Sequence, residues 1–143
     1  MGSVERRPMP YVITIPSSPA FVLKGMKGYQ FELLENTELD IYLLDVEKGH
    51  DMFIISKKLT RIYYILEGAG YFTIENRKYD VGPGVLVEVP PNVEYSYSGT
   101  MKILLVSNPR WFRGNEEETR KNPDVCGGFS VSSLLSRIGA GRK

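Results

Sequence analysis

Residues 61–75 read Arg-Ile-Tyr-Tyr-Ile-Leu-Glu-Gly-Ala-Gly-Tyr-Phe-Thr-Ile-Glu. Two short runs rich in β-branched and aromatic residues flank the glycine-rich segment 68–70. Such runs, bounded by glycine, are typical of neighbouring strands joined by a turn. Because successive side chains of a strand point to opposite faces, Arg61, Tyr63 and Ile65 are expected to share one face. The stretch therefore predicts two antiparallel strands with a tight turn at 68–70.

Similar runs lie on both sides of this stretch. They are separated by segments rich in Gly, Pro and Asn, which is turn chemistry. The additional runs cover residues 11–15, 21–23, 29–34, 39–46, 52–57, 85–89 and 101–107. Short strands at near-regular spacing indicate an antiparallel sandwich or closed barrel. The sequence predicts an all-β protein, an antiparallel double-sheet jelly-roll barrel over residues 11–112.

The C-terminal part has a different pattern. Residues 113–124 are mostly charged and lack apolar periodicity, which favours a solvated loop or a single helical turn. Residues 129–138 place Phe129, Leu134 and Ile138 among serines, a pattern that a short amphipathic helix would show. We therefore expect residues 113–143 to form a tail outside the barrel.

Composition excludes several classes of function. The chain has 143 residues, enough for one domain, and a formal charge of +1, without the basic surplus of a nucleic-acid-binding protein. No apolar run approaches the roughly 18 residues that cross a membrane, and residues 1–10 are too polar for a signal peptide. We expect a cytoplasmic protein. Its single cysteine, Cys126, excludes an internal disulfide, and its single histidine, His50, excludes metal centres that need two.

Residues 49–99 carry two spaced motifs that resemble those of the cupin superfamily. The first motif runs from Gly49 to Gly68, and the second begins at Gly84 and places its proline at Pro90. The resemblance implies a cupin barrel and a homodimer. It also implies four metal-ligand positions inside the barrel, which fall here on Ile55, Lys57, Arg61 and Tyr95.

These four substitutions remove the chemistry that holds a metal. Divalent metals are bound by neutral imidazole and carboxylate groups, and Ile55 has no donor atom. Charged Lys57 and Arg61 have no free lone pair and would repel a cation. We therefore expect no metal and no cofactor.

The same substitutions suggest a different ligand. If the family register holds, Lys57 and Arg61 face the barrel interior together with Tyr63, Tyr95 and Tyr97. Adjacent cations repel, and an anion relieves that repulsion. The first hypothesis is therefore a small anionic ligand: a sugar acid, a sugar phosphate, a nucleotide sugar or another carboxylate. In the alternative, the two cations point outward or pair internally with one of four acids, Glu32, Asp45, Glu88 or Glu94.

Two further functions stay open. One is a metal-independent isomerase, epimerase or lyase with Tyr95 or Tyr63 as the acid and Lys57 or His50 as the base, although His50 alone reads more simply as a surface residue. The other is a non-catalytic interaction module, in which the C-terminal tail and aromatic surface residues such as Trp111 contact a partner.

Overall fold

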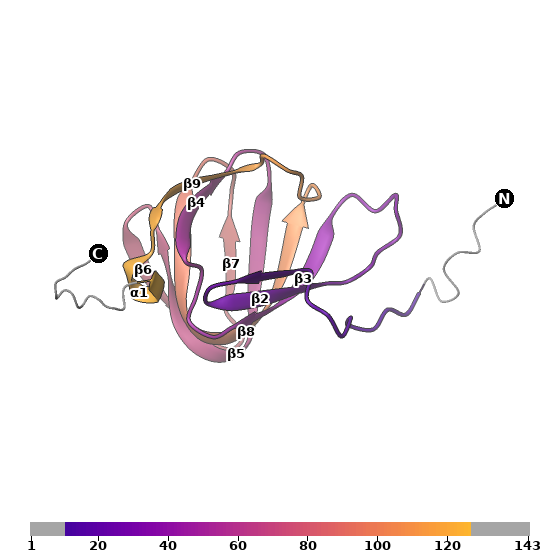
Figure 1. Ribbon diagram of the computed structural model, residues 1–143, viewed down its shortest axis with the longest axis horizontal. Coiled ribbons are helices and arrows are strands. Elements are labelled where there is room, and N and C mark those ends of the chain that lie inside the picture. Colours follow the sequence, from indigo (N-terminus) through magenta and orange to yellow (C-terminus); the bar gives the residue numbers. More distant parts are fainter. Residues whose placement is uncertain (1–10, 127–143) are drawn as a thin grey trace.

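Nine antiparallel strands and one short helix make up residues 11–126, the part of the chain that the computed structural model describes (Figure 1). The strands are β1 (Phe21–Leu23), β2 (Met26–Gln30), β3 (Asp40–Val46), β4 (Met52–Ser56), β5 (Thr60–Ile74), β6 (Arg77–Val81), β7 (Leu86–Val89), β8 (Glu94–Asn108) and β9 (Glu116–Lys121). The helix is α1 (Pro123–Cys126). The predicted all-β class and antiparallel jelly roll are confirmed.

The two longest strands, β5 and β8, hold the molecule together. They pair with each other from Thr60↔Asn108 to Ile74↔Tyr95 and contribute one half of their length to each sheet. All nine strands form one hydrogen-bonded sheet that curls into two layers. One layer has the order β6-β5-β8-β4-β9, and the other has the order β7-β5-β8-β3-β2-β1. A cavity can form between the sheets because the shared strands bend from one layer into the other.

Glycines allow this bend. Gly68 and Gly99 have φ angles of 86° and 134°, a region that side-chain-bearing residues rarely occupy. A Cβ on Gly99 would stand 2.5 Å from the carbonyl oxygen of Ala69, so the neighbouring strand approaches too closely for a side chain. Residues 68–70 were predicted to be a turn, but they continue β5, with a register shift between Ile65 and Glu67.

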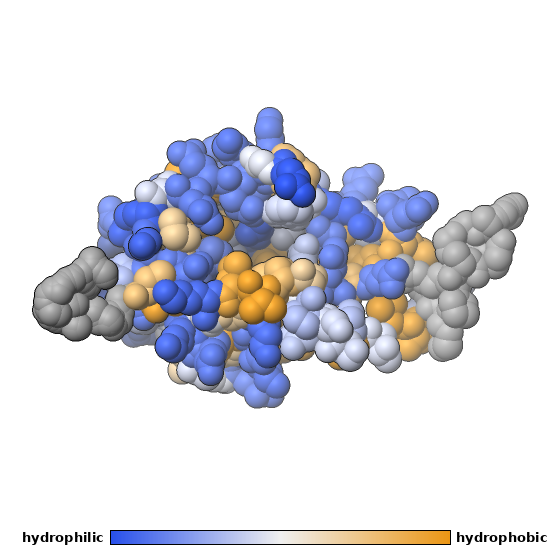
Figure 2. Space-filling view, in the orientation of Figure 1, coloured by the Kyte–Doolittle hydropathy of each residue, from blue (hydrophilic) through white to orange (hydrophobic). Residues whose placement is uncertain are grey.

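The core lies between the sheets and follows the predicted alternation. Arg61, Tyr63 and Ile65 of β5 are all buried, and Tyr64 on the opposite face is 40% exposed. Large apolar and aromatic side chains from both sheets meet them in one cluster, including Leu44, Ile54, Phe72, Val89, Tyr95, Tyr97 and Ile103. On the face seen in Figure 2 the surface is mostly hydrophilic, with an apolar patch near the β1–β2 hairpin.

Three expectations need correction or fall outside the described residues. Residues 11–15 form no strand, and residues 113–124 are not a free loop, because β9 pairs with β4 and α1 begins at Pro123. The amphipathic helix expected at 129–138 lies outside the described part. Within residues 11–126, no helix has the length and apolar character needed to cross a membrane.

Replacing Gly99 with alanine is expected to destabilise the fold by about 2–4 kcal/mol, because backbone strain of about 1–3 kcal/mol adds to a clash with Ala69. Gly84 is the matched control: its φ is also positive, 89°, but nothing lies within 4 Å of an added Cβ. Chemical denaturation of both variants checks the prediction. Equal losses of unfolding free energy would show that close strand approach is not what requires Gly99.

Candidate functional site

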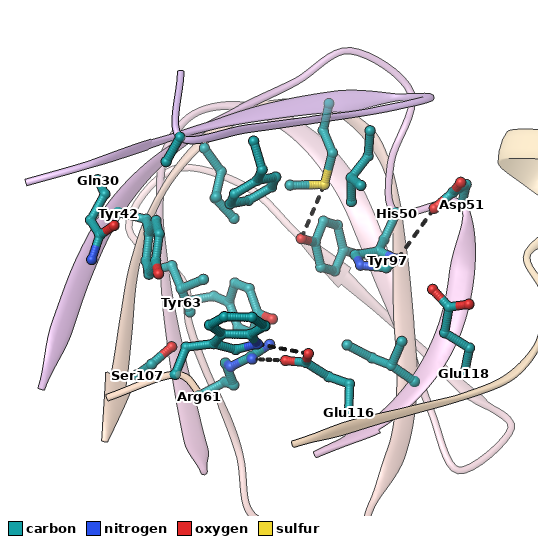
Figure 3. Close-up of a pocket in the computed structure, with 18 residues that line it drawn as sticks. Gln30, Tyr42, His50, Asp51, Arg61, Tyr63, Tyr97, Ser107, Glu116 and Glu118 are labelled. Carbon is teal, nitrogen blue, oxygen red and sulfur yellow. Dashed lines mark hydrogen bonds and ion pairs between the residues drawn. The ribbon is translucent and has the colours of Figure 1, made fainter. Parts of the chain in front are cut away.

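A cavity of about 470 Å³ opens between the two sheets. Strands of both layers and the loop after β3 contribute its walls (Figure 3). Apolar side chains such as Phe21, Leu44 and Ile54 supply part of the lining. The polar lining residues are Gln30, Tyr42, His50, Asp51, Arg61, Tyr63, Tyr97, Ser107, Glu116 and Glu118. Such a concave site with a few convergent polar groups is the usual form of a small-molecule pocket.

Arg61 at the start of β5 is the charged centre of the cavity. It is only 7% exposed, and its guanidinium forms an ion pair with Glu116 and donates to the hydroxyl of Tyr95 at 3.3 Å. Burial by itself would lower the pKa of Arg61, but Tyr95, Tyr63 and Glu116 outweigh burial and raise that pKa. The group therefore stays cationic. Its buried Nε has no hydrogen-bond partner among the described residues.

Three tyrosines pack edge to face beside Arg61. The ring centroid of Tyr63 lies 5.9 Å from that of Tyr95 and 5.4 Å from that of Tyr97. The hydroxyl oxygens of Tyr63 and Tyr95 are 2.5 Å apart. Burial raises the pKa of Tyr63 and of Tyr97 well above the ordinary value of 10.0, so both hydroxyls keep their protons near pH 7.

His50, in the loop before β4, has the opposite property. Burial lowers its pKa below 6.5, although Asp51 opposes the shift, so the ring is neutral near pH 7. Its Nδ1 lies 2.9 Å from the carbonyl oxygen of Met52, which can only accept a hydrogen bond. The backbone N–H of Met52 also lies 3.2 Å from the same Nδ1. Donation to the carbonyl puts the proton on Nδ1 and the lone pair on Nε2, whereas acceptance from the N–H requires the opposite tautomer. The ring meets the edge of Tyr97 at 5.8 Å.

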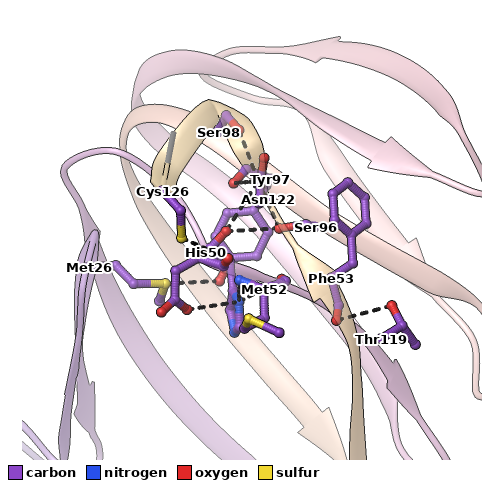
Figure 4. A network of polar contacts seen from close by, with 11 residues as sticks. Met26, His50, Met52, Phe53, Ser96, Tyr97, Ser98, Thr119, Asn122 and Cys126 are labelled. Carbon is purple, nitrogen blue, oxygen red and sulfur yellow. Dashed lines mark hydrogen bonds and ion pairs between the residues drawn. The ribbon is translucent and has the colours of Figure 1, made fainter. Parts of the chain in front are cut away.

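The segment after β9 holds His50 in place (Figure 4). The buried Asn122 places its Nδ2 3.1 Å from the carbonyl oxygen of His50, 3.0 Å from Ser96 Oγ and 3.2 Å from Ser98 Oγ. The thiol of Cys126 donates to the carbonyl of Asp51 at 3.3 Å. Residues just after β9 therefore fix the backbone of the histidine loop.

The residues expected in the site are only partly brought together. Arg61, Tyr63 and Tyr97 line the cavity, and Tyr95 contacts two of them from behind. Lys57 is exposed and does not line the cavity, because β4 ends at Ser56 and Lys57 lies in the following turn. It does not stand beside Arg61, as the motif register had suggested.

The register also differs along β4. Ile54, not Ile55, lines the cavity, and the pairing of β4 with β9 shifts between Phe53 and Ile54. Arg61 is paired internally, but with Glu116 and with none of the four acids considered from the sequence. Sequence reasoning missed Glu116 because its charged neighbours in β9 resemble a solvated loop.

The side chains at the metal-ligand positions of the cupin motifs decide whether this barrel can hold a metal ion. Across residues 11–126, no three His, Cys, Asp or Glu side chains are grouped so that they could hold a metal ion. Two of the motif's ligand positions are Arg61 and Tyr95, which are bound to each other. The donor set does not fit a metal centre.

Comparisons with known sequences find partial matches. A family model described as an AraC-like ligand binding domain matches residues 58–99. An uncharacterised protein of Methanocaldococcus jannaschii is 35% identical over 60 residues, which are 39% of this chain and 48% of that protein. The matched stretch thus spans about half the length of this curated relative.

Solved structures extend the likeness to the whole barrel. Pac13 of Streptomyces, described as a nucleoside dehydratase, superposes with a TM-score of 0.73 at 23% identity over 83% of this chain and 98% of its own. KdgF of Halomonas gives 0.56 at 15% identity, over 66% and 87% of the two chains. Salicylate 1,2-dioxygenase of Pseudoaminobacter salicylatoxidans gives 0.55 at 16%, over 63% and 26%. The protein has the cupin fold.

One sequence feature is shared with Pac13 in detail. Three Pac13 variants, with a substituted histidine, tyrosine and second tyrosine, were solved with uridine. In chain order these positions are separated by 13 and then 34 residues. In this chain, His50, Tyr63 and Tyr97 have the same residue types in the same order at the same separations.

The imidazole ring of His50 is expected to titrate with a midpoint below pH 6.5 in NMR spectra. Its ring signals are assigned directly because the chain has a single histidine. The folded pKa lies below that of the unfolded chain, so the unfolded state binds more protons between the two values. Unfolding free energy should therefore fall as the pH drops through this window and lose that dependence in His50→Gln. A midpoint at or above 6.5 would contradict the buried, neutral ring.

Replacing Asn122 with alanine is expected to cost about 1–3 kcal/mol of stability, because buried partners lose their hydrogen bond. It should also raise the pKa of His50 toward 6.5 as the loop becomes more exposed to water. The control is Asn115→Ala, which removes a buried amide that bonds Lys58 and Ser56 instead. An unchanged His50 titration in Asn122→Ala would show that Asn122 does not position the histidine.

Proposed function

We propose that this protein is a metal-independent lyase that binds a small, nucleoside-like molecule and eliminates water from its sugar. The observation that carries the proposal is the placement of His50, Tyr63 and Tyr97 around one cavity, at the separations of the three substituted positions of Pac13. It refines one of the alternatives left open by the sequence, an enzyme that works by proton transfer without a metal.

His50 is the base of the proposed reaction. Its ring is neutral near pH 7, and in the tautomer whose Nδ1–H donates to the Met52 carbonyl, Nε2 carries the lone pair. A general base must be unprotonated to act, and it works best with a pKa near the working pH. His50 Nε2 takes the proton from a sugar carbon, and the electron pair of that C–H bond forms the new double bond as the neighbouring C–O bond breaks.

Tyr63 is the acid that protonates the departing hydroxide. Its hydroxyl contacts that of Tyr95, which in turn accepts a hydrogen bond from Arg61. This chain lets the Arg61 cation stabilise the negative charge that Tyr63 acquires on giving up its proton. The products are an unsaturated sugar and water. Return of the proton from His50 to Tyr63 restores the starting state.

The rest of the cavity suits a planar, uncharged ring. Tyr42 and Trp111 present aromatic faces, and the Gln30 amide and Ser107 hydroxyl offer hydrogen bonds. Gln30 and Tyr42 lie across the cavity from His50 and Asp51 (Figure 3). A nucleoside matches this arrangement, with its flat base beside Gln30 and Tyr42 and its sugar beside His50.

An anion held by Lys57 and Arg61 is the weaker candidate. Lys57 is exposed, and the charge of Arg61 is already paired with Glu116. Asp51 and Glu118 add two further carboxylates to the lining. Three carboxylates against one guanidinium disfavour a negatively charged ligand.

Replacing His50 with glutamine is expected to preserve uridine binding within about threefold while lowering turnover by about 10²–10⁴-fold, the usual contribution of a general base. Tyr63→Phe should show the same separation. Binding is measured by calorimetry with uridine. Proton transfer is measured by NMR, as deuterium exchange from solvent into the sugar C–H positions across a panel of nucleosides and their oxidised derivatives.

Lys57→Met serves as the control, since Lys57 lies outside the cavity, and both readouts should match those of the wild type. Absence of uridine binding in the wild type would remove the nucleoside ligand. Full deuterium exchange in His50→Gln would remove the histidine from its role as the base.

A further inference from the structure

Arg61 has the features of an anion receptor. Among the described residues, Arg61 is the one Lys or Arg side chain that lines the cavity. It is only 7% exposed, and its buried Nε has no hydrogen-bond partner there. A planar guanidinium in a water-poor site is well suited to phosphate or carboxylate. Without a counter-ion it would be costly to bury.

Glu116 already fills this receptor. One of its carboxylate oxygens pairs with Arg61, and the other accepts a hydrogen bond from Trp111 Nε1 at 2.8 Å. Trp111 is itself tied to β3, because its backbone N–H donates to Asp40 Oδ2 at 2.7 Å. The carboxylate is therefore held on the guanidinium from two sides, at the start of a strand that pairs with β4.

A phosphate that displaced Glu116 would share one cavity with three carboxylates. Asp51 and Glu118 line the same cavity, so an expelled Glu116 would add its charge to theirs. The like-charge repulsion is largest in such a low-dielectric site. An uncharged ligand meets none of this repulsion and leaves the Arg61–Glu116 pair intact.

We propose that Glu116 determines specificity by acting as a built-in anion, so that the cavity accepts unphosphorylated nucleosides and rejects their phosphates. This inference rests on the proposed function for the identity of the uncharged ligand. The exclusion of anions by Glu116 stands on the ion pair and the charges alone. Glu116 is thus a selectivity residue, separate from the proton-transfer roles of His50 and Tyr63.

The test replaces each of two glutamates of the cavity with glutamine, which has the same shape but no charge. Glu116→Gln frees the guanidinium, whereas Glu118→Gln removes one negative charge without touching Arg61. Uridine and uridine monophosphate are titrated into each protein by calorimetry. The wild type should bind the monophosphate at least about tenfold more weakly than uridine, since repulsive charges give specificity.

In Glu116→Gln the affinity for the monophosphate should rise by about tenfold or more, and the affinity for uridine should change by less than about threefold. In Glu118→Gln the ratio should move toward the monophosphate by clearly less than in Glu116→Gln, because one repulsive charge is lost but Arg61 stays paired with Glu116. Adding Arg61→Met to Glu116→Gln should abolish the gain. Equal gains in the two glutamine variants, or a wild type that binds both ligands alike, would overturn the inference.

A second readout separates this inference from the proposed function. Inorganic phosphate should raise the melting temperature of Glu116→Gln more than that of the wild type or Glu118→Gln, because binding stabilises the folded state. If uridine binds no variant but phosphate shows this pattern, the nucleoside ligand fails and the anion exclusion holds. If phosphate stabilises all three proteins equally, the exclusion fails.

Glu116→Asp covers the case in which Glu116→Gln does not fold. It keeps the charge but withdraws the carboxylate from Arg61 by one methylene. The affinity ratio should then move toward the monophosphate by about threefold or more. An unchanged ratio in a folded Glu116→Asp protein would overturn the inference.

Discussion

A guanidinium buried between two sheets constrains most of the site. An isolated charge at the position of Arg61 would be unstable, and the chain compensates it with the Glu116 carboxylate and the Tyr95 hydroxyl. The compensation requires β9 to lie beside β4, because Glu116 is the first residue of that strand. It also orients Tyr95 toward Tyr63. The electrostatics of one side chain thus links the arrangement of the strands to the chemistry of the cavity.

Burial also separates the proton donors from the proton acceptor. The charged form of a group is disfavoured in a water-poor interior, whatever its sign. For His50 this lowers the pKa and leaves a neutral base, and for Tyr63 and Tyr97 it raises the pKa and retains the proton. The same cause therefore prepares opposite roles on groups that lie within one cavity.

The sequence was informative where strand alternation and motif spacing agree. Arg61, Tyr63 and Ile65 share the inner face, and the cupin barrel follows from the strand pattern and the two motifs. Lys57 was misplaced because the end of β4 at Ser56 leaves no signal in the sequence. Alternation continues only as long as the strand does.

Glu116 was out of reach for a different reason. Its partner Arg61 lies 55 positions away, and the charged run that contains Glu116 reads as a surface loop. Polar strands such as β9 are recognised by pairing with a neighbour, here β4, which a single sequence does not display. His50 was read as a surface residue because the segment that buries it, around Asn122, was expected to lie outside the barrel.

The sharing of β5 and β8 between both layers has a kinetic consequence. The two layers are joined by the continuous hydrogen bonding of β5 with β8, so they cannot separate about a hinge. A molecule that enters the cavity then does so without the two layers separating, and Trp111 in the cavity wall is 45% exposed and bonded to Glu116. Exchange of a bound molecule then requires side-chain motions, which are far faster than a rearrangement of the sheets.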